Sequence, residues 1–170
     1  AWGGSDFTFG DVTLRKPKHD NHELLGKTKF AGCLGVMKDV KRNKYTQKAN
    51  IVADCSTDGK EVYKLKSTAN TANWWYDHRI SLIDAKTFAD YRTEYFKGGK
   101  HIKTIDRSWV SANLDDPRAS YWGYWYGKTN TTGHETMAFI PSTITKVNHK
   151  YKKKNLWSTT TLKKMPKKIK

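Results

Sequence analysis

Short runs of alternating polar and apolar residues recur along the chain, and a spacing of two is typical of β-strands that bury one face. The alternation is clearest at 61–66 and 101–105, and the pairs Asp58-Gly59 and Gly98-Gly99 resemble the tight turns of β-hairpins. Turn-forming residues follow at intervals of roughly 8 to 12 residues, as in sandwiches and barrels. We therefore predict an all-β fold, an antiparallel β-sandwich or irregular barrel, over residues 1–149.

Four segments are less regular. Residues 1–15 are expected to form one or two short strands broken near Gly10, and residues 16–23, all polar around a proline, to form a loop. Residues 24–40 are predicted to form a strand, because three glycines discourage a helix. Residues 84–97 match either a helix capped by Gly98-Gly99 or one arm of a β-hairpin, and their content of β-formers favours the hairpin.

Two stretches are unusually rich in aromatic residues, and we expect them to meet in the folded protein. In an extended strand, Tyr121 and Trp125 would project to one side, with Trp122, Tyr124 and Tyr126 on the other. These side chains would either fill the core of a β-domain or form a platform that stacks on sugar rings or nucleobases. The candidate ligand-binding aromatic residues are Trp74, Trp75, Tyr76, Tyr121, Trp122, Tyr124, Trp125 and Tyr126.

Positive charge is large and unevenly distributed. Lysine and arginine total 32 against 16 acidic residues, a formal net charge of +16, and residues 136–170 contain ten lysines and no acid. Such a surplus attracts polyanions over long distances. Residues 150–170 therefore form a basic tail, and its interspersed aromatic residues suggest that it packs partly on the domain. Its candidate ligand-binding lysines are Lys152, Lys153, Lys154, Lys163, Lys164, Lys167 and Lys168.

In its mixture of lysine and tyrosine, this tail is similar in composition to the wall-binding ends of surface-layer proteins from lactobacilli. The similarity implies an exported protein and assigns no role to any residue.

Cys33 and Cys55 are the only cysteines. An even number of cysteines in an exported chain favours a disulfide, and we predict that these two are bonded. The chain begins with alanine, as a secreted protein does after its signal peptide is removed. We expect the protein to be secreted or associated with a cell surface.

Motifs of known enzymes and cofactor sites are missing from the sequence. It has neither the G-x-S-x-G elbow of hydrolases nor a phosphate-binding loop, and His19 and His22 lack the spacing of a zinc-protease motif. We therefore predict no catalytic residues, no metal and no cofactor. An enzyme that cleaves wall polysaccharide stays open as an alternative, with Asp77 paired to Glu94 or Glu135 after folding.

From these features we predict a secreted cationic protein that binds an anionic cell-surface polymer, such as teichoic acid or an acidic polysaccharide. Lysines would attract the polymer and aromatic rings would stack on it. A cationic antimicrobial protein and a nucleic-acid-binding protein are the alternatives, because both share this composition.

Overall fold

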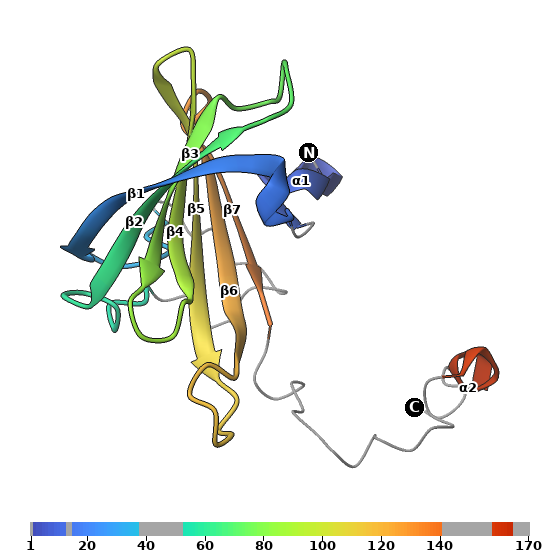
Figure 1. Ribbon diagram of the computed structural model, residues 1–170. Helices are drawn as coiled ribbons and strands as arrows, with labels where there is room; N and C mark the ends of the chain where they lie inside the picture. The colour runs from blue at the N-terminus through green and yellow to red at the C-terminus, as the bar shows by residue number, and fades with distance from the viewer. Residues whose placement is uncertain (1, 13–14, 38–52, 141–157, 165–170) are drawn as a thin grey trace.

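The computed structural model describes residues 2–12, 15–37, 53–140 and 158–164. Its centre is one antiparallel sheet in which each strand pairs with the next strand along the chain (Figure 1). The predicted all-β, antiparallel class is confirmed, and the open, curled sheet is consistent with an irregular barrel. The strands are β1 (Asp20–Lys29), β2 (Glu61–Ala69), β3 (His78–Asp84), β4 (Asp90–Lys97), β5 (Lys100–Ser111), β6 (Ser120–Thr129) and β7 (His134–Phe139).

Helices are short. The expected strands at the N-terminus are wrong, because that segment forms a 3-10 turn, η1 (Trp2–Gly4), and the helical turn α1 (Phe9–Val12). The Asp11 carboxylate accepts hydrogen bonds from the backbone N–H and the hydroxyl of Thr8, which closes this turn. The predicted loop at 16–23 is partly wrong, since η2 (Pro17–His19) leads directly into β1. A further helix, α2 (Thr159–Lys164), lies in the predicted basic tail.

The hairpin prediction at Gly98-Gly99 is confirmed, because β4 and β5 pair across these two residues. The strand predicted at 61–66 and the aromatic stretch at 121–127 correspond to β2 and β6, and β7 follows β6. Of the strand expected over 24–40, the part up to Lys29 belongs to β1 and residues 30–37 run irregularly across the sheet, whereas residues 38–40 lie outside the described residues.

We name the two faces of the sheet after what covers them. The aromatic face carries Thr93, Tyr95, Ile105 and Trp125, which cross-strand pairing and packing place together. The N-terminal segment 2–12 lies over part of this face, as Figure 1 shows. A cluster of buried and half-buried side chains fills the space between them: Phe7, Ala69, Trp74, Trp75, Tyr76, Tyr95, Ile102, Ile105, Trp122 and Trp125.

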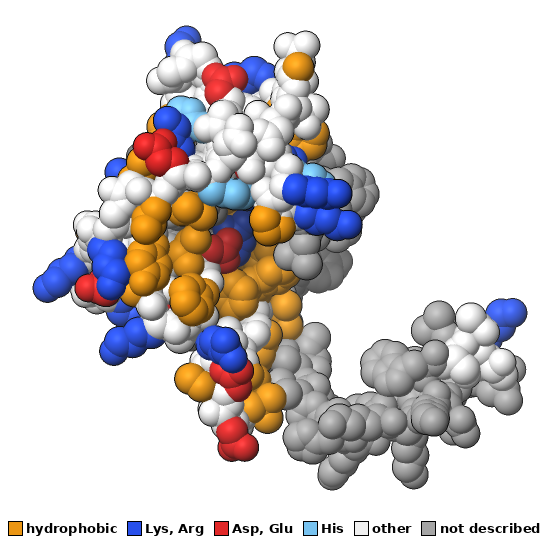
Figure 2. Space-filling view, in the orientation of Figure 1, with side chains coloured by type: hydrophobic (Ala, Val, Ile, Leu, Met, Phe, Trp, Pro, Cys, Tyr) orange, Lys and Arg blue, Asp and Glu red, His pale blue; other side chains and the backbone are white. Residues whose placement is uncertain are grey.

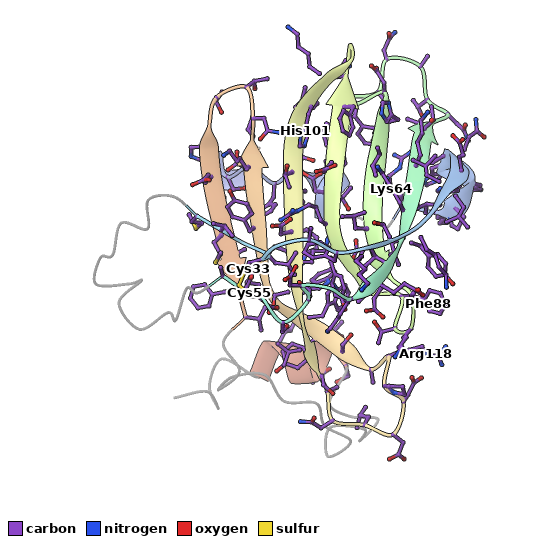
Figure 3. The ribbon with its side chains drawn as sticks, turned by 90° about the vertical axis from the view of Figure 1, so that its left-hand side faces the viewer. Cys33, Cys55, Lys64, Phe88, His101 and Arg118 are labelled. Atoms are coloured by element: carbon purple, nitrogen blue, oxygen red, sulfur yellow. A yellow bond between two sulfur atoms is a disulfide. The ribbon has the colours of Figure 1, made fainter. Side chains whose placement is uncertain are left out.

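The opposite surface, the disulfide face, is covered by residues 30–37 and 53–60, which run in front of the strands in Figure 3. Phe30 and Leu34 are buried there against Val62 and Tyr91. The predicted disulfide between Cys33 and Cys55 is confirmed and joins the two covering segments. Next to it, Leu34 and Asp54 exchange two backbone hydrogen bonds of 2.8 and 3.0 Å.

A buried carboxylate fastens this cover to the sheet. Asp106 accepts two hydrogen bonds from the Arg92 guanidinium, at 2.7 and 2.9 Å, and one from the backbone N–H of Gly35, at 2.9 Å. Arg92 also donates to the carbonyl oxygen of Cys33. The Tyr124 hydroxyl adds a bond to the carbonyl oxygen of Leu34, so the cover is held by a connected polar network.

Candidate functional site: an apolar groove on the aromatic face

The aromatic face contains an open apolar pocket beside the N-terminal segment, at the ends of β6 and β7. Its volume is about 160 Å³. The lining residues are Phe7, Trp122, Tyr124, Trp125, Ala138, Phe139 and Ile140. We call this pocket, together with the apolar part of the aromatic face that continues from it, the aromatic groove.

Phe7 is held in the wall of the groove by its neighbour Asp6. The buried Asp6 carboxylate accepts hydrogen bonds from the hydroxyls of Thr129, at 2.6 Å, and Thr136, at 2.7 Å, and lies 2.8 Å from Nδ1 of His134. These contacts tie the N-terminal segment to the hairpin of β6 and β7. The Phe7 ring then packs edge to face against Trp125, with ring centroids 5.7 Å apart.

Gly127 makes this approach possible. A Cβ atom at position 127 would lie 2.9 Å from the Phe7 ring, a distance that side chains do not tolerate. The strand therefore needs glycine where the Phe7 ring crosses it.

A β-bulge sets the direction of Trp122. Ser108 pairs with Tyr124, but the next residue of β5, Trp109, pairs with Trp122, so Gly123 is the extra residue. The bulge turns Trp122 toward Trp125, with ring centroids 4.4 Å apart. The sequence-based prediction that these two side chains lie on opposite sides of the strand is therefore wrong.

An ion pair between a buried arginine and a half-buried aspartate interrupts the apolar surface. Arg107 stacks over the Trp125 ring at 4.7 Å, donates to the Thr93 hydroxyl at 3.1 Å and pairs with Asp90 at 2.9 Å. Burial raises the pKa of Asp90, although the Arg107 charge acts in the opposite direction. Ligand pockets typically combine an apolar lining with a few such polar groups.

The apolar surface extends across the sheet from the pocket toward β1. Leu24, 60% exposed, pairs with Leu65, and Tyr63 pairs with Ile83, all on the strands that carry the aromatic face. Figure 2 shows hydrophobic side chains gathered on this side of the molecule around a basic and an acidic side chain. The groove is thus longer than its pocket.

The structure brings the two predicted aromatic stretches together, as expected. Trp74, Trp75 and Tyr76 share one hydrophobic cluster with Trp122 and Trp125. Tyr76 and Trp125 are buried, and most of the others are half-buried. The interpretation as core side chains therefore holds for the buried residues, and a ligand-binding role of the eight aromatic residues stays a prediction.

The hydroxyl groups of two of the predicted tyrosines form hydrogen bonds on the disulfide face. The hydroxyl of Tyr126 donates to Glu135 at 2.6 Å, and burial together with this bond raises the pKa of Tyr126. Tyr124 has its hydroxyl bonded to Leu34, and burial raises its pKa to about 12. Tyr121 is half-buried and pairs with Val110.

The basic tail is described only in part. Lys163 and Lys164 belong to α2, whereas Lys152, Lys153, Lys154, Lys167 and Lys168 lie outside the described residues. The boundary between a domain at 1–149 and a tail at 150–170 stays a prediction, as does contact of these lysines with nucleic acid or another anionic partner.

His22 and Asp77, two of the residues singled out in the sequence, have hydrogen-bond partners within the protein. Both ring nitrogens of His22 lie within hydrogen-bonding distance of protein oxygens, at Ser67 and Pro17. Asp77 accepts a bond from the backbone N–H of Gly98. Over the ranges that the structure covers, no three histidine, cysteine or acidic side chains are grouped to hold a metal ion. None of the helices in those ranges is long and apolar enough to cross a membrane.

Sequence reasoning missed Phe7, Ala138, Phe139 and Ile140 as parts of a site. Phe7 was assigned to a strand, although a glycine in the middle of an aromatic strand, Gly127, is a signal that another residue approaches closely. No local pattern places residue 7 beside residue 127, because that contact depends on the tertiary fold.

Solved structures share this fold at low sequence identity. A domain from Vibrio parahaemolyticus, assigned to the outer membrane lipoprotein-sorting proteins, has a TM-score of 0.57 and 15% identity, and the match covers 92% of this chain and 55% of that one. A DUF1329 family protein from Desulfovibrio piger also has a TM-score of 0.57 and 15% identity, covering 81% of this chain and 46% of that one. The chain therefore spans about half the length of these two proteins.

A LolA superfamily protein from Nitrosomonas europaea is a weaker match, with a TM-score of 0.49 and 14% identity over 84% of this chain and 56% of that one. No protein-family model and no curated protein sequence matches the chain.

These findings correct the predicted function. The prediction of a protein that binds an anionic cell-surface polymer is wrong, because the chain has the fold of proteins assigned to lipoprotein sorting and turns its aromatic rings into a core and an apolar groove. Wall binding and antimicrobial activity find no support in the comparisons.

Proposed function

We propose that the chain binds a hydrophobic ligand of the lipid acyl-chain class in the aromatic groove. The observation that carries this proposal is the open pocket between Phe7, Trp122, Trp125 and Ala138, whose walls are aromatic and aliphatic side chains. An exposed apolar surface of this kind marks a binding site more often than a chance feature of a monomer. The fold shared with a domain assigned to lipoprotein sorting supports the same class of ligand.

The dimensions of the aromatic groove fit an extended acyl chain better than a compact ligand. A dry cavity of about 150 Å³ holds a benzene-sized molecule, so the pocket of about 160 Å³ accommodates only the end of an acyl chain. The remainder of the acyl chain would lie along the aromatic face toward Leu65 and Leu24. Each methylene buried there contributes about 0.8 kcal/mol.

Chain length provides a direct test. Calorimetric titration with saturated fatty acids of increasing length should show the dissociation constant falling about fourfold per added methylene until the groove is full. Affinity that does not depend on chain length would contradict burial of the chain.

Ala138 offers a matched pair of variants. Ala138 is exposed and lines the pocket, so Ala138→Phe should fill it and weaken binding at least about tenfold without destabilising the fold. The control is Ala72→Phe, the same substitution at an exposed residue of the β2–β3 connection. If both variants bind the fatty acid like the wild type, the ligand does not occupy this pocket.

We also propose that the protein works outside the cytoplasm. The Cys33–Cys55 disulfide supports this, since such bonds persist in oxidising compartments. Mass spectrometry of natively sourced protein under non-reducing conditions should find both thiols oxidised. Two free thiols would contradict an exported location.

A further inference from the structure

The turn between β3 and β4 presents an apolar ring to solvent in a strained backbone conformation. Phe88 is 63% exposed and has a φ of 60°, in the left-handed region that large side chains avoid. An exposed phenylalanine in this conformation contributes nothing to the core and destabilises the turn. Strain of this type is more often retained where a side chain has a function.

A buried carboxylate keeps the Phe88 turn in this shape. Asp84 Oδ1 accepts hydrogen bonds from the backbone N–H groups of Lys86, at 2.9 Å, and Thr87, at 2.7 Å, and from the Thr87 hydroxyl. Asp84 Oδ2 accepts the Tyr91 hydroxyl at 2.7 Å. The Phe88 N–H donates to the Asp84 carbonyl oxygen at 3.1 Å. The Phe88 ring is therefore presented on a braced turn.

Two lysines lie near the Phe88 turn. Lys60 and Lys86 line an open hollow of about 350 Å³ next to the Phe88 turn, and the backbone N–H of Ala85 bonds to the Glu61 carbonyl oxygen, which fixes the two segments side by side. The acids that line the hollow are engaged elsewhere, because Asp84 holds the turn and Glu61 pairs with Lys27 at 2.8 Å. Lys60 Nζ lies 5.7 Å from the centroid of the Tyr91 ring, and neither lysine forms an ion pair with an acidic side chain among the described residues.

A second exposed apolar side chain lies at the same end of the sheet, followed by two exposed acids, Asp115 and Asp116. The β5–β6 loop carries Leu114, 46% exposed, directly after Asn113, which also has a positive φ of 53°. Figure 3 shows Phe88 and Arg118, a residue of the same β5–β6 loop, at this lower end of the sheet. Both hairpin tips therefore point away from the body of the sheet.

We propose that this end of the sheet, with Phe88 as its anchor, docks on an anionic membrane surface. The Phe88 ring would enter the acyl boundary while Lys60 and Lys86 pair with lipid phosphates. Aromatic rings favour this interfacial depth, and lysines are attracted to anionic lipids. The net charge of +16 supports a membrane over an apolar protein partner, because it draws the whole chain to a negative surface. The proposal does not rest on the aromatic groove.

Vesicle binding by the full chain tests the anchor. Flotation with phosphatidylcholine vesicles, with and without phosphatidylglycerol, should show binding to the anionic vesicles that falls at least about tenfold in Phe88→Asp. The control is Val36→Asp on the disulfide face, where an equally exposed valine, at 56%, undergoes the same change of charge and should leave binding within about twofold. An equal loss in both variants, or no loss in either, would overturn the proposal.

Phe88→Gly separates binding from folding. Glycine adopts a φ of 60° without strain, so the midpoint of thermal unfolding should be unchanged or higher while vesicle binding is lost. A Lys60→Gln and Lys86→Gln double variant should reduce binding to anionic vesicles in particular. A Phe88→Gly variant that still binds anionic vesicles like the wild type would refute the anchor, and wild-type binding by Ala138→Phe would show that docking is independent of the groove.

Discussion

The two faces of the sheet differ in whether their buried polar groups form hydrogen bonds. On the disulfide face, the hydroxyls of Tyr91, Tyr124 and Tyr126 donate to Asp84, to the Leu34 carbonyl and to Glu135. On the aromatic face, several buried donors have no partner among the described residues: Nε1 of Trp74, Trp75, Trp122 and Trp125, Nε of Arg79, and the Tyr76 hydroxyl. In the described part of the disulfide face and its cover, one such atom is found, Thr57 Oγ1.

The pKa of one carboxylate on each face shows a further difference. Burial alone would raise the pKa of Asp84, but hydrogen bonds from Tyr91 and from the backbone of Thr87 and Lys86 outweigh it and lower the pKa. Burial does raise the pKa of Asp90, on the aromatic face. Asp84 is therefore better solvated by the protein than Asp90.

The two faces differ in how they satisfy buried polar groups, and this difference affects stability. Unpaired buried donors cost free energy, and the disulfide face avoids that cost with a cross-linked polar network. The aromatic face accepts it and leaves an apolar groove open. We infer that the disulfide face holds the sheet together so that the aromatic face can stay available to a ligand.

The largest expected effect concerns the buried carboxylate of the disulfide face. Asp106→Ala leaves Arg92 and the Gly35 N–H without their acceptor, and should lower the free energy of unfolding by about 3–5 kcal/mol. Urea denaturation measures this loss. Asp116→Ala removes an exposed partner of Arg118 and should leave the denaturation midpoint unchanged. Equal midpoints for the two variants would contradict a structural role for the Asp106 network.

The same substitution, tyrosine to phenylalanine, can be made on both faces and its effect on stability compared. Tyr124→Phe removes a hydroxyl that bonds to the Leu34 carbonyl at 2.9 Å and accepts from the Asp54 N–H at 3.1 Å, and should cost about 1–2 kcal/mol. Tyr76→Phe removes a buried hydroxyl without a partner and should leave stability unchanged or raise it. If Tyr76→Phe destabilises the protein as much as Tyr124→Phe, the two faces do not differ in the way described.

The smallest effect is a dependence on pH at Asp54. Burial would raise the pKa of Asp54, but hydrogen bonds from Ser56 and Ser108 lower it below the usual value of about 3.9. A lowered pKa in the folded state stabilises the protein above the unfolded-state pKa, and this contribution is lost as the pH falls through the folded-state pKa. The stability difference between wild type and Asp54→Asn should therefore shrink on acidification, as thermal unfolding at several pH values would show. A constant difference would contradict the assignment.

The sequence was sufficient for the fold class because its signals are local. Strict alternation at 61–66 and the Gly98-Gly99 turn predict strands and a hairpin without tertiary information. The cysteine pair was equally informative, because two cysteines allow one intramolecular bond.

The candidate site depends on tertiary contacts that the sequence does not display. The bulge at Gly123 reverses Trp122 relative to a regular strand, and a bulge cannot be located without its partner strand. Phe7 packs on Gly127 of β6. The N-terminal segment, whose alternation predicts a strand, therefore lines the groove instead. The net charge favoured the lysine-rich tail as a binding site. Net charge, however, determines solubility and long-range attraction and does not identify a binding site.

Fluorescence quenching would show whether an acyl chain occupies the pocket. Trp122 and Trp125 line the pocket, so a fatty acid brominated near the end of its acyl chain should quench tryptophan emission, and the unbrominated acid should displace it. Ala138→Phe should abolish the quenching, and Ala72→Phe should retain it. Quenching that is missing in the wild type, or that persists unchanged in Ala138→Phe, would contradict a groove that binds acyl chains.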